Sequence, residues 1–94
     1  MIPVARQEML KAARRYKRKG LGLDDRFLDA IRDAILAIRD WPTAHPPTRV
    51  PPYRRKILND LPFSLVYRVD ADIAAIVAVA HMKRRPQYWK RRVE

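Results

Sequence analysis

The fold of this chain is decided by residues 63–82, which read FSLVYRVDADIAAIVAVAHM. Over residues 63–69 apolar side chains recur at every second position, a period that is typical of a β-strand. Asp70-Ala71-Asp72 forms a tight turn, and the run from Ile73 to Met82 is almost continuously apolar, as in a strand covered on both sides. This stretch therefore predicts an antiparallel hairpin.

A further strand is predicted before this hairpin, and an amphipathic tail after it. Residues 53–61 form an extended stretch with exposed basic side chains, so we expect the first strand there. Residues 86–92 begin with proline and are expected to form a short tail helix, with Tyr88 and Trp89 as its apolar anchors. At the other end of the chain, residues 2–5 are expected to pair with the sheet as a truncated edge strand.

Helical periodicity dominates the N-terminal half. Residues 6–19 place apolar side chains on one face and basic side chains around the rest, and Gly20 is expected to end that helix. Residues 24–40 carry an unbroken apolar stripe at steps of three and four, with Asp24 or Asp25 as the expected N-terminal cap. The sequence therefore predicts two antiparallel helices joined by a short turn.

Proline separates these helices from the strands. Residues 41–52 contain five prolines in twelve positions, which neither a helix nor a central strand tolerates. The pattern favours a stiff crossover loop over a proline-rich ligand for a partner module. The predicted fold class is α+β, with an N-terminal helical hairpin packed on one face of a small antiparallel β-meander and a short C-terminal tail helix, in one domain of residues 1–94.

Composition excludes several classes of function. The chain has 94 residues and no cysteine, so disulfide frameworks, thiol nucleophiles and cysteine-based zinc sites are ruled out. Its two histidines are too few to build a metal site, and we expect no metal and no cofactor. No apolar run reaches the roughly 18–20 residues that cross a bilayer, and the first residues lack the pattern of a secretory signal. We expect a soluble, cytoplasmic protein without a membrane partner.

Positive charge is the strongest bulk feature of the sequence. The formal net charge is +11, and basic residues gather near both ends of the chain. Residues 24–40 are the exception, because five aspartates outnumber three arginines there. A field of this strength favours acidic or phosphate-rich partners.

Four phrases of the sequence follow one another through the helical turn, the strands and the tail. They are LGLDDRFLD (21–29), YRRKIL (53–58), LPFSLVYRV (61–69) and AVAHMKRRPQYW (78–89). Together they resemble the RelE/ParE superfamily of toxins from bacterial type II toxin–antitoxin systems, and the resemblance covers nearly the whole chain. The usual first strand of the family is shortened here to a few residues.

The resemblance implies a compact toxin that arrests growth and is neutralised by a cognate acidic antitoxin, with DNA contacted indirectly through the complex of the two. Relatives divide into two mechanisms. ParE-like members poison DNA gyrase without cutting nucleic acid, whereas RelE-like members cut mRNA in the ribosomal A site. The tail after His81 is more similar to the ParE-like group, which favours gyrase over the ribosome and its mRNA.

RNA cleavage without a metal would need a base, an acid and cations that stabilise the phosphorane charge. His81 titrates nearest neutrality, and His81 and Arg68 are expected on the same face of adjacent strands. A packing role for His81 and an ion pair of Arg68 with Asp70, Asp72 or the chain terminus are the competing interpretations. No glutamate is expected near the sheet, since the only two are Glu8 and Glu94. The candidate catalytic residues of a RelE-like enzyme are His81, Arg68, Arg85, Lys56 and Tyr88.

Two binding surfaces are also predicted. The seam of the helical hairpin and the cationic sheet would suit an acidic amphipathic segment that folds on binding. Tyr88 and Trp89 are interpreted first as anchors of the tail, not as stacking platforms for bases. The candidate antitoxin contacts are Arg14, Leu21, Leu23, Leu28, Ile35, Arg55, Arg85 and Trp89. The candidate target contacts are Lys83, Arg84, Arg85, Lys90 and Arg91.

Three hypotheses for function follow from the sequence. The first is a non-enzymatic inhibitor of gyrase, and the second is a ribosome-dependent endoribonuclease. The third is a basic nucleic-acid-binding module without toxicity, which the sequence favours least because it contains no glycine-rich loop or helix-turn-helix signature.

Overall fold

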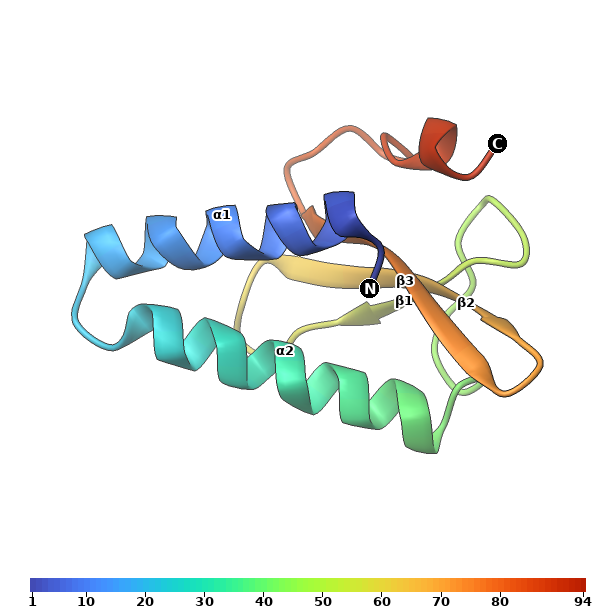
Figure 1. The fold of residues 1–94 in the computed structure, drawn as a ribbon, viewed down its shortest axis with the longest axis horizontal. Coiled ribbons are helices and arrows are strands. Elements are labelled where there is room, and N and C mark those ends of the chain that lie inside the picture. The colour runs from blue at the N-terminus through green and yellow to red at the C-terminus, as the bar shows by residue number, and fades with distance from the viewer.

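Two antiparallel helices make up the N-terminal half of the chain, as Figure 1 shows. The computed structural model describes residues 1–94, which is the whole chain. Helix α1 spans Pro3–Lys19 and helix α2 spans Leu23–Asp40. Both bury an apolar stripe against the sheet and leave charged side chains outside. The predicted helical hairpin is confirmed.

The start of α1 differs from the sequence-based expectation. The helix begins at Pro3, because proline is well suited to the first turn, where its missing N–H needs no partner. The edge strand expected over residues 2–5 is therefore wrong. Of these four residues, Ile2 alone has a backbone hydrogen bond to the sheet, its N–H donating to the carbonyl of Ile76 at 2.9 Å.

The start of α2 also differs from expectation. The residue before the helix is Gly22, whose φ of 78° lies in the left-handed region that glycine adopts without strain. No side chain caps the helix, so the prediction of a cap from Asp24 or Asp25 is wrong. Both carboxylates nevertheless lie in the first turn, where negative charge is favourable to the helix dipole.

The sheet is an antiparallel meander in the order β1-β2-β3. Strand β1 spans Arg54–Ile57, β2 spans Phe63–Asp70 and β3 spans Ile73–His81. Strand β1 is shorter than the stretch 53–61 expected from the sequence. The chain turns back at Asp60, whose φ of 60° is incompatible with a strand.

The register between β2 and β3 changes in the middle of the pair. Tyr67 lies opposite Ile76, whereas the preceding residue Val66 lies opposite Ala78, which leaves Val77 without a partner. One extra residue on a strand is a β-bulge, and it moves every later side chain to the other face. The last residues of β3 therefore lie on the opposite sheet face from the one that they would occupy in a hairpin without a bulge.

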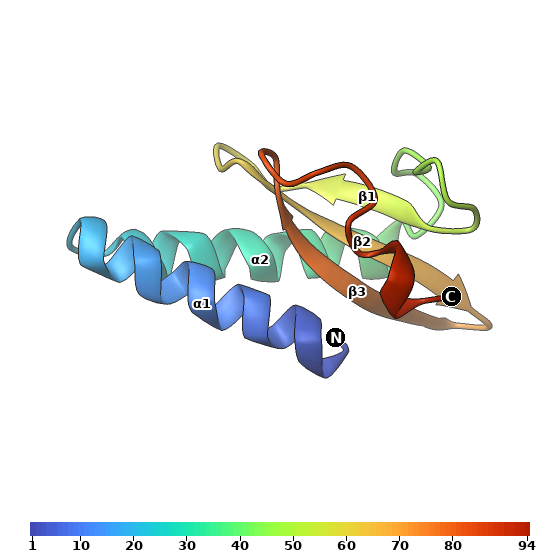
Figure 2. The same ribbon diagram turned by 90° about the horizontal axis from the view of Figure 1, so that it is seen from above.

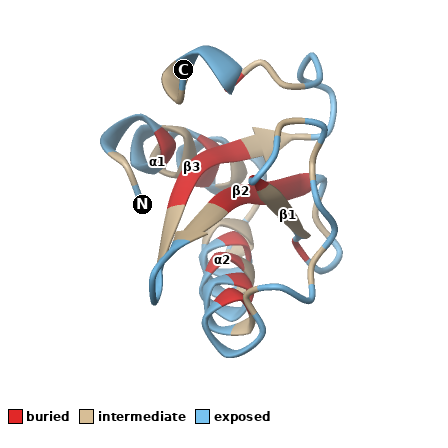
Figure 3. Ribbon diagram, turned by 90° about the vertical axis from the view of Figure 1, so that its right-hand side faces the viewer, coloured by how far each residue is buried: buried red, intermediate tan, exposed pale blue.

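Both faces of the sheet are covered. Helices α1 and α2 pack on one face, which we call the helix side, and the C-terminal tail turns back across the strands on the other, the tail side (Figures 1 and 2). Buried residues are concentrated in β2, β3 and α2 (Figure 3). The core residues of the tail side are Tyr53, Val66, Val77, Ala78 and Trp89.

The tail is less helical than expected. Its only helical segment is the 3₁₀ turn η1, Lys90–Arg92. The expected helix from Pro86 is interrupted at Gln87, whose φ is 56°. Trp89 is 1 % exposed, so its predicted role as an anchor is confirmed. The α+β architecture is as predicted, and neither helix combines the length and hydropathy that crossing a bilayer would require.

Candidate functional site

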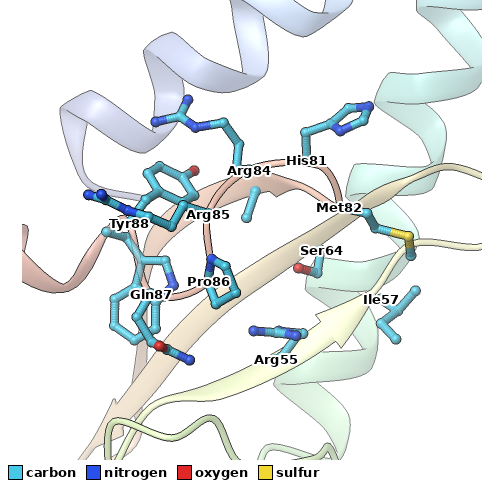
Figure 4. Close-up of a pocket in the computed structure, with 12 residues that line it drawn as sticks. Arg55, Ile57, Ser64, His81, Met82, Arg84, Arg85, Pro86, Gln87 and Tyr88 are labelled. Carbon is cyan, nitrogen blue, oxygen red and sulfur yellow. The ribbon is translucent and has the colours of Figure 1, made fainter.

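A cleft opens on the tail side between β1 and the chain that leaves β3. It has a volume of about 150 Å³ and is shown in Figure 4. Its walls come from β1, from the ends of β2 and β3, and from the turn over residues 82–89. The lining side chains used below are Arg55, Ile57, Met82, Arg84, Arg85 and Tyr88.

The cleft is cationic. Three arginines line it and no acidic side chain does. Like that of Arg68, the Nε atom of Arg55 is buried and has no hydrogen-bond partner, and an unpaired buried donor is costly. Arg84 lies with its guanidinium 3.8 Å from the centre of the Tyr88 ring, so this cation is held on an aromatic face.

The tail beside the cleft is fixed by a partly buried carboxylate. Glu8 of α1 accepts hydrogen bonds from Tyr88 Oη at 2.6 Å, from both terminal nitrogens of Arg92 at 2.8 and 2.9 Å, and from the N–H of Val79 at 3.1 Å. The prediction that no glutamate lies near the sheet is therefore wrong. The network joins α1, β3 and the tail at one point.

These contacts shift the pKa values of Glu8, Tyr88 and Arg92. Burial would raise the pKa of Glu8, but the hydrogen bonds from Arg92, Tyr88 and Val79 outweigh it and lower the pKa. Burial and the bond to Glu8 raise the pKa of Tyr88. The bond to Glu8 likewise raises the pKa of Arg92. The charged forms of Glu8 and Arg92 are thus the stable ones.

We expect this network to make stability depend on pH. The pKa of Glu8 is lower in the folded chain, so its contribution is complete above the unfolded value of about 4.3 and is lost as pH falls through the folded value. The difference in unfolding temperature between the wild type and Glu8→Gln should be largest at neutral pH and shrink toward about pH 3. A difference that stays constant with pH would contradict this. Glu94→Gln, at the exposed end of the chain, is the control.

His81 lies at the end of β3 and faces the helix side, pointing away from the cleft in Figure 4. Its ring meets that of Phe63 edge-on at 4.8 Å, and its Nδ1 accepts the N–H of Lys83 at 3.0 Å. Burial, followed by the charges of Lys83, Arg15 and Lys19, lowers the pKa of His81. The ring is therefore neutral at pH 7 and carries its proton on Nε2.

The expectation that Arg68 and His81 share a sheet face is wrong. His81 lies opposite Phe63 on the helix side, because the bulge at Val77 reverses the end of β3. Arg68 lies five positions along β2 from Phe63, on the tail side, where its guanidinium is 5.6 Å from the ring centre of Tyr53. Its Nη2 donates to Asp70 at 2.6 Å, which confirms the interpretation as an ion pair.

The other candidate catalytic residues are divided between the two faces. Lys56 lies opposite Leu65, a helix-side residue, and does not line the cleft. Arg85 and Tyr88 do line it, but the Tyr88 hydroxyl is engaged by Glu8. Three of the five candidates, His81, Arg85 and Tyr88, thus border the cleft, but the His81 ring is turned to the helix side against Phe63. No three histidine or carboxylate side chains are placed to hold a metal ion.

The candidate antitoxin contacts have different surroundings. Leu21 at the helical turn is fully exposed, Leu28 and Ile35 are more than one-third exposed on α2, and Leu23 is half-buried. Arg14 is exposed on α1, and Arg55 and Arg85 lie in the cleft. Trp89, in the tail, is buried against the sheet, so the prediction that it offers a contact surface is wrong.

A second opening, of about 480 Å³, lies between the end of α2 and the β2–β3 hairpin. It is mainly apolar, with Ile35, Ile38, Pro42 and Ile76 among its lining residues. The exposed apolar stripe of α2 that contains Leu28 and Ile35 adjoins this opening, because Ile35 also lines it. The candidate target contacts lie elsewhere, on exposed positions of the turn after β3 and of η1, namely Lys83, Arg84, Arg85, Lys90 and Arg91.

Sequence reasoning missed Glu8, Ile57 and Met82. A signal for Glu8 was present, because it falls on the same helix face as the buried Ala5 and Ala12, where an acidic side chain needs a partner. No comparable signal marked the other two, since single exposed apolar residues are common on protein surfaces.

Comparison with known proteins gives one match. The chain matches the family model described as the ParE toxin of the type II toxin–antitoxin system parDE over residues 3–86. The match covers both helices and all three strands. Comparisons with curated proteins and with solved structures gave no match.

Proposed function

Because the chain belongs to the ParE toxin family of type II toxin–antitoxin systems, we propose that it arrests bacterial growth by binding DNA gyrase and that an acidic antitoxin neutralises it. In this proposal the protein acts in the cytoplasm and binds its target without cutting nucleic acid.

The main support for binding over RNA cleavage is the separation of the acid–base candidates. His81 and Arg68 lie on opposite faces of the sheet, and Asp70 already pairs with the arginine. The Nδ1 lone pair of His81 accepts a backbone N–H, so it is not available to take a proton from a ribose hydroxyl. The Arg68 cation therefore cannot act beside His81 on one phosphodiester, as the endoribonuclease hypothesis requires of this pair.

The cations after β3 are the proposed target contacts. Lys83, Arg84 and Arg85 follow one another in an exposed turn, and Lys90 and Arg91 are exposed on η1. They project from a chain of net charge +11, which favours rapid association with an acidic protein surface. The antitoxin is proposed to cover the exposed leucines of the helical hairpin together with part of this cationic surface.

A gyrase supercoiling assay run beside a ribosome-dependent mRNA cleavage assay tests the proposal. The purified protein is expected to inhibit supercoiling and to leave mRNA intact. Changing Lys83, Arg84 and Arg85 to glutamine should raise the concentration needed for inhibition about tenfold, because these charges steer and hold the target.

The matched control is a variant in which Arg6, Arg18 and Arg26 are glutamines, since these exposed helix residues make the same change in net charge. It should inhibit like the wild type. Cleavage of mRNA with supercoiling unaffected would overturn the proposal in favour of an endoribonuclease. Equal loss in both triple variants would show that net charge, and not the turn after β3, determines binding.

A further inference from the structure

The outer edge of β1 is only half covered. The N–H of Arg55 donates to the carbonyl of Pro46 at 2.9 Å, and the N–H of Thr48 donates to the carbonyl of Tyr53 at 2.8 Å. Backbone groups of an antiparallel strand alternate in direction, so those of Ile57 also point away from β2. The Arg55 carbonyl and both backbone groups of Ile57 have no partner in the chain.

The opposite edge of the sheet is covered from Ile76 to Val79. On β3 the carbonyl of Ile76 accepts the N–H of Ile2, and the carbonyl of Val77 accepts Arg92 at 3.1 Å. The next outward N–H, that of Val79, donates to Glu8. Of the two sheet edges, only that of β1 adjoins the cationic cleft.

The side chains beside the open edge line the cleft. Arg55 lies opposite Val66 and Ile57 opposite Ser64, so both project on the tail side. Ile57 and Met82 are 49 % and 60 % exposed and stand at one end of the cleft, with the arginines further along it (Figure 4). An added strand would place alternate side chains first beside Ile57 and then beside Arg55.

We infer that the edge of β1 and the adjoining cleft form a docking site for an extended acidic segment of a protein partner, which adds as a fourth strand. The segment carries an acidic and an apolar residue two positions apart, one for the unpartnered guanidinium of Arg55 and the other for Ile57 and Met82. The inference rests on the proposed function in taking the antitoxin as the partner that supplies this segment.

Charge and aromatic content favour this occupant over a second copy of the chain or a nucleic acid. In a second copy, β1 would bring Arg54, Arg55 and Lys56 against the same three cations, which is unfavourable for residues directly opposite each other. Binding of single-stranded nucleic acid combines a cationic groove with free aromatic faces on which bases stack. Here the Tyr88 ring is covered by Arg84, and Trp89 is buried.

Titration of the purified wild-type chain with a blocked peptide of about eight residues, in which threonine alternates with leucine and glutamate, tests the site. Amide NMR shifts are expected to be largest at Ile57. Methylating the backbone nitrogens of the leucine and glutamate residues, whose N–H groups would face β1, should weaken binding at least about tenfold. Methylating the threonine nitrogens should leave it unchanged.

Two further comparisons test the charge contact. A peptide with glutamine in place of glutamate should bind at least about fivefold more weakly. Arg55→Lys, which keeps the charge but lacks Nε, should weaken binding of the glutamate peptide, and Arg6→Lys on the outside of α1 should not.

Several outcomes would overturn the inference. They are no binding of the peptide, equal loss on methylation at either set of nitrogens, and tighter binding of an oligothymidine of the same charge. None of these results affects the supercoiling assay. Conversely, a protein that leaves gyrase active can still bind the peptide, so the two proposals fail separately.

Discussion

Replacing Trp89 with alanine is expected to lower the free energy of unfolding by about 4 kcal/mol, because truncating a buried aromatic side chain removes its packing and leaves a cavity. The side chain is 1 % exposed, and its ring centre lies 5.3 Å from that of Tyr53. It is the largest member of the small tail-side core, which contains only five buried residues. No other tail residue is buried, so nothing nearby can take its place.

Trp41→Ala is the matched control. That tryptophan is 69 % exposed after the end of α2, and its removal should change stability by no more than about 0.5 kcal/mol. Urea unfolding followed by circular dichroism measures both variants. Within the Trp41→Ala background, fluorescence reports on Trp89 alone and should show a buried indole that becomes exposed on unfolding. Equal losses from the two substitutions would contradict the assignment of Trp89 as the anchor of the tail.

The hairpin of β2 and β3 could be predicted from sequence, but its bulge could not. Alternation over residues 63–69 and the turn at residues 70–72 are strong signals for the two strands. In β3 almost every residue is apolar, so a shift of one position leaves the hydrophobic pattern unchanged. The extra residue at Val77 therefore gave no signal, and the face assigned to His81 was reversed.

The ends of the chain were harder to predict than its middle. Ile2-Pro3-Val4-Ala5 is apolar and β-branched enough to suit a strand, yet proline is equally suited to starting a helix. In the tail, Tyr88 and Trp89 have an amphipathic pattern, but Gln87 adopts a left-handed conformation that local sequence did not indicate. Tertiary contacts to the sheet determine the tail conformation.

The candidate site was predicted as separate residues and not as an arrangement. The exposed leucines of the helical hairpin and the arginines of the cleft were all identified from the sequence. The sheet face on which each strand residue lies depends on strand register, which a single sequence specifies weakly. Trp89 shows the difficulty, since an aromatic residue in a basic tail suits both an anchor and a contact, and only its burial distinguishes them.

Replacing Glu8 with alanine is expected to lower the free energy of unfolding by about 3 kcal/mol, because it leaves a largely buried arginine without its counter-charge. The side chains of Glu8 and Arg92 are only 16 % and 20 % exposed. The same change removes the acceptor for Tyr88 and for the N–H of Val79. Amide hydrogen exchange at Val79 should accelerate in this variant.

A double-mutant cycle with Arg92→Ala separates the ion pair from the rest of the network. Arg92→Ala should cost less than Glu8→Ala, about 2 kcal/mol, since the carboxylate keeps its bonds from Tyr88 and Val79. The double variant should be only slightly less stable than Glu8→Ala, because without Glu8 the arginine has lost its counter-charge and keeps only its hydrogen bond to the Val77 carbonyl. Urea unfolding of the four proteins gives the coupling energy.

The pair Lys90–Glu94 provides the control cycle in the same tail. Its atoms are 4.0 Å apart and both side chains are more than half exposed, so its coupling should not exceed about 0.5 kcal/mol. If the Glu8–Arg92 coupling were equally small, solvent would screen that pair as well and the carboxylate would not be what fixes the tail. A large coupling, together with the greater loss from Glu8→Ala, would place the tail attachment at Glu8. The tail-side core and the wall of the cleft would then depend on one carboxylate in a chain of net charge +11.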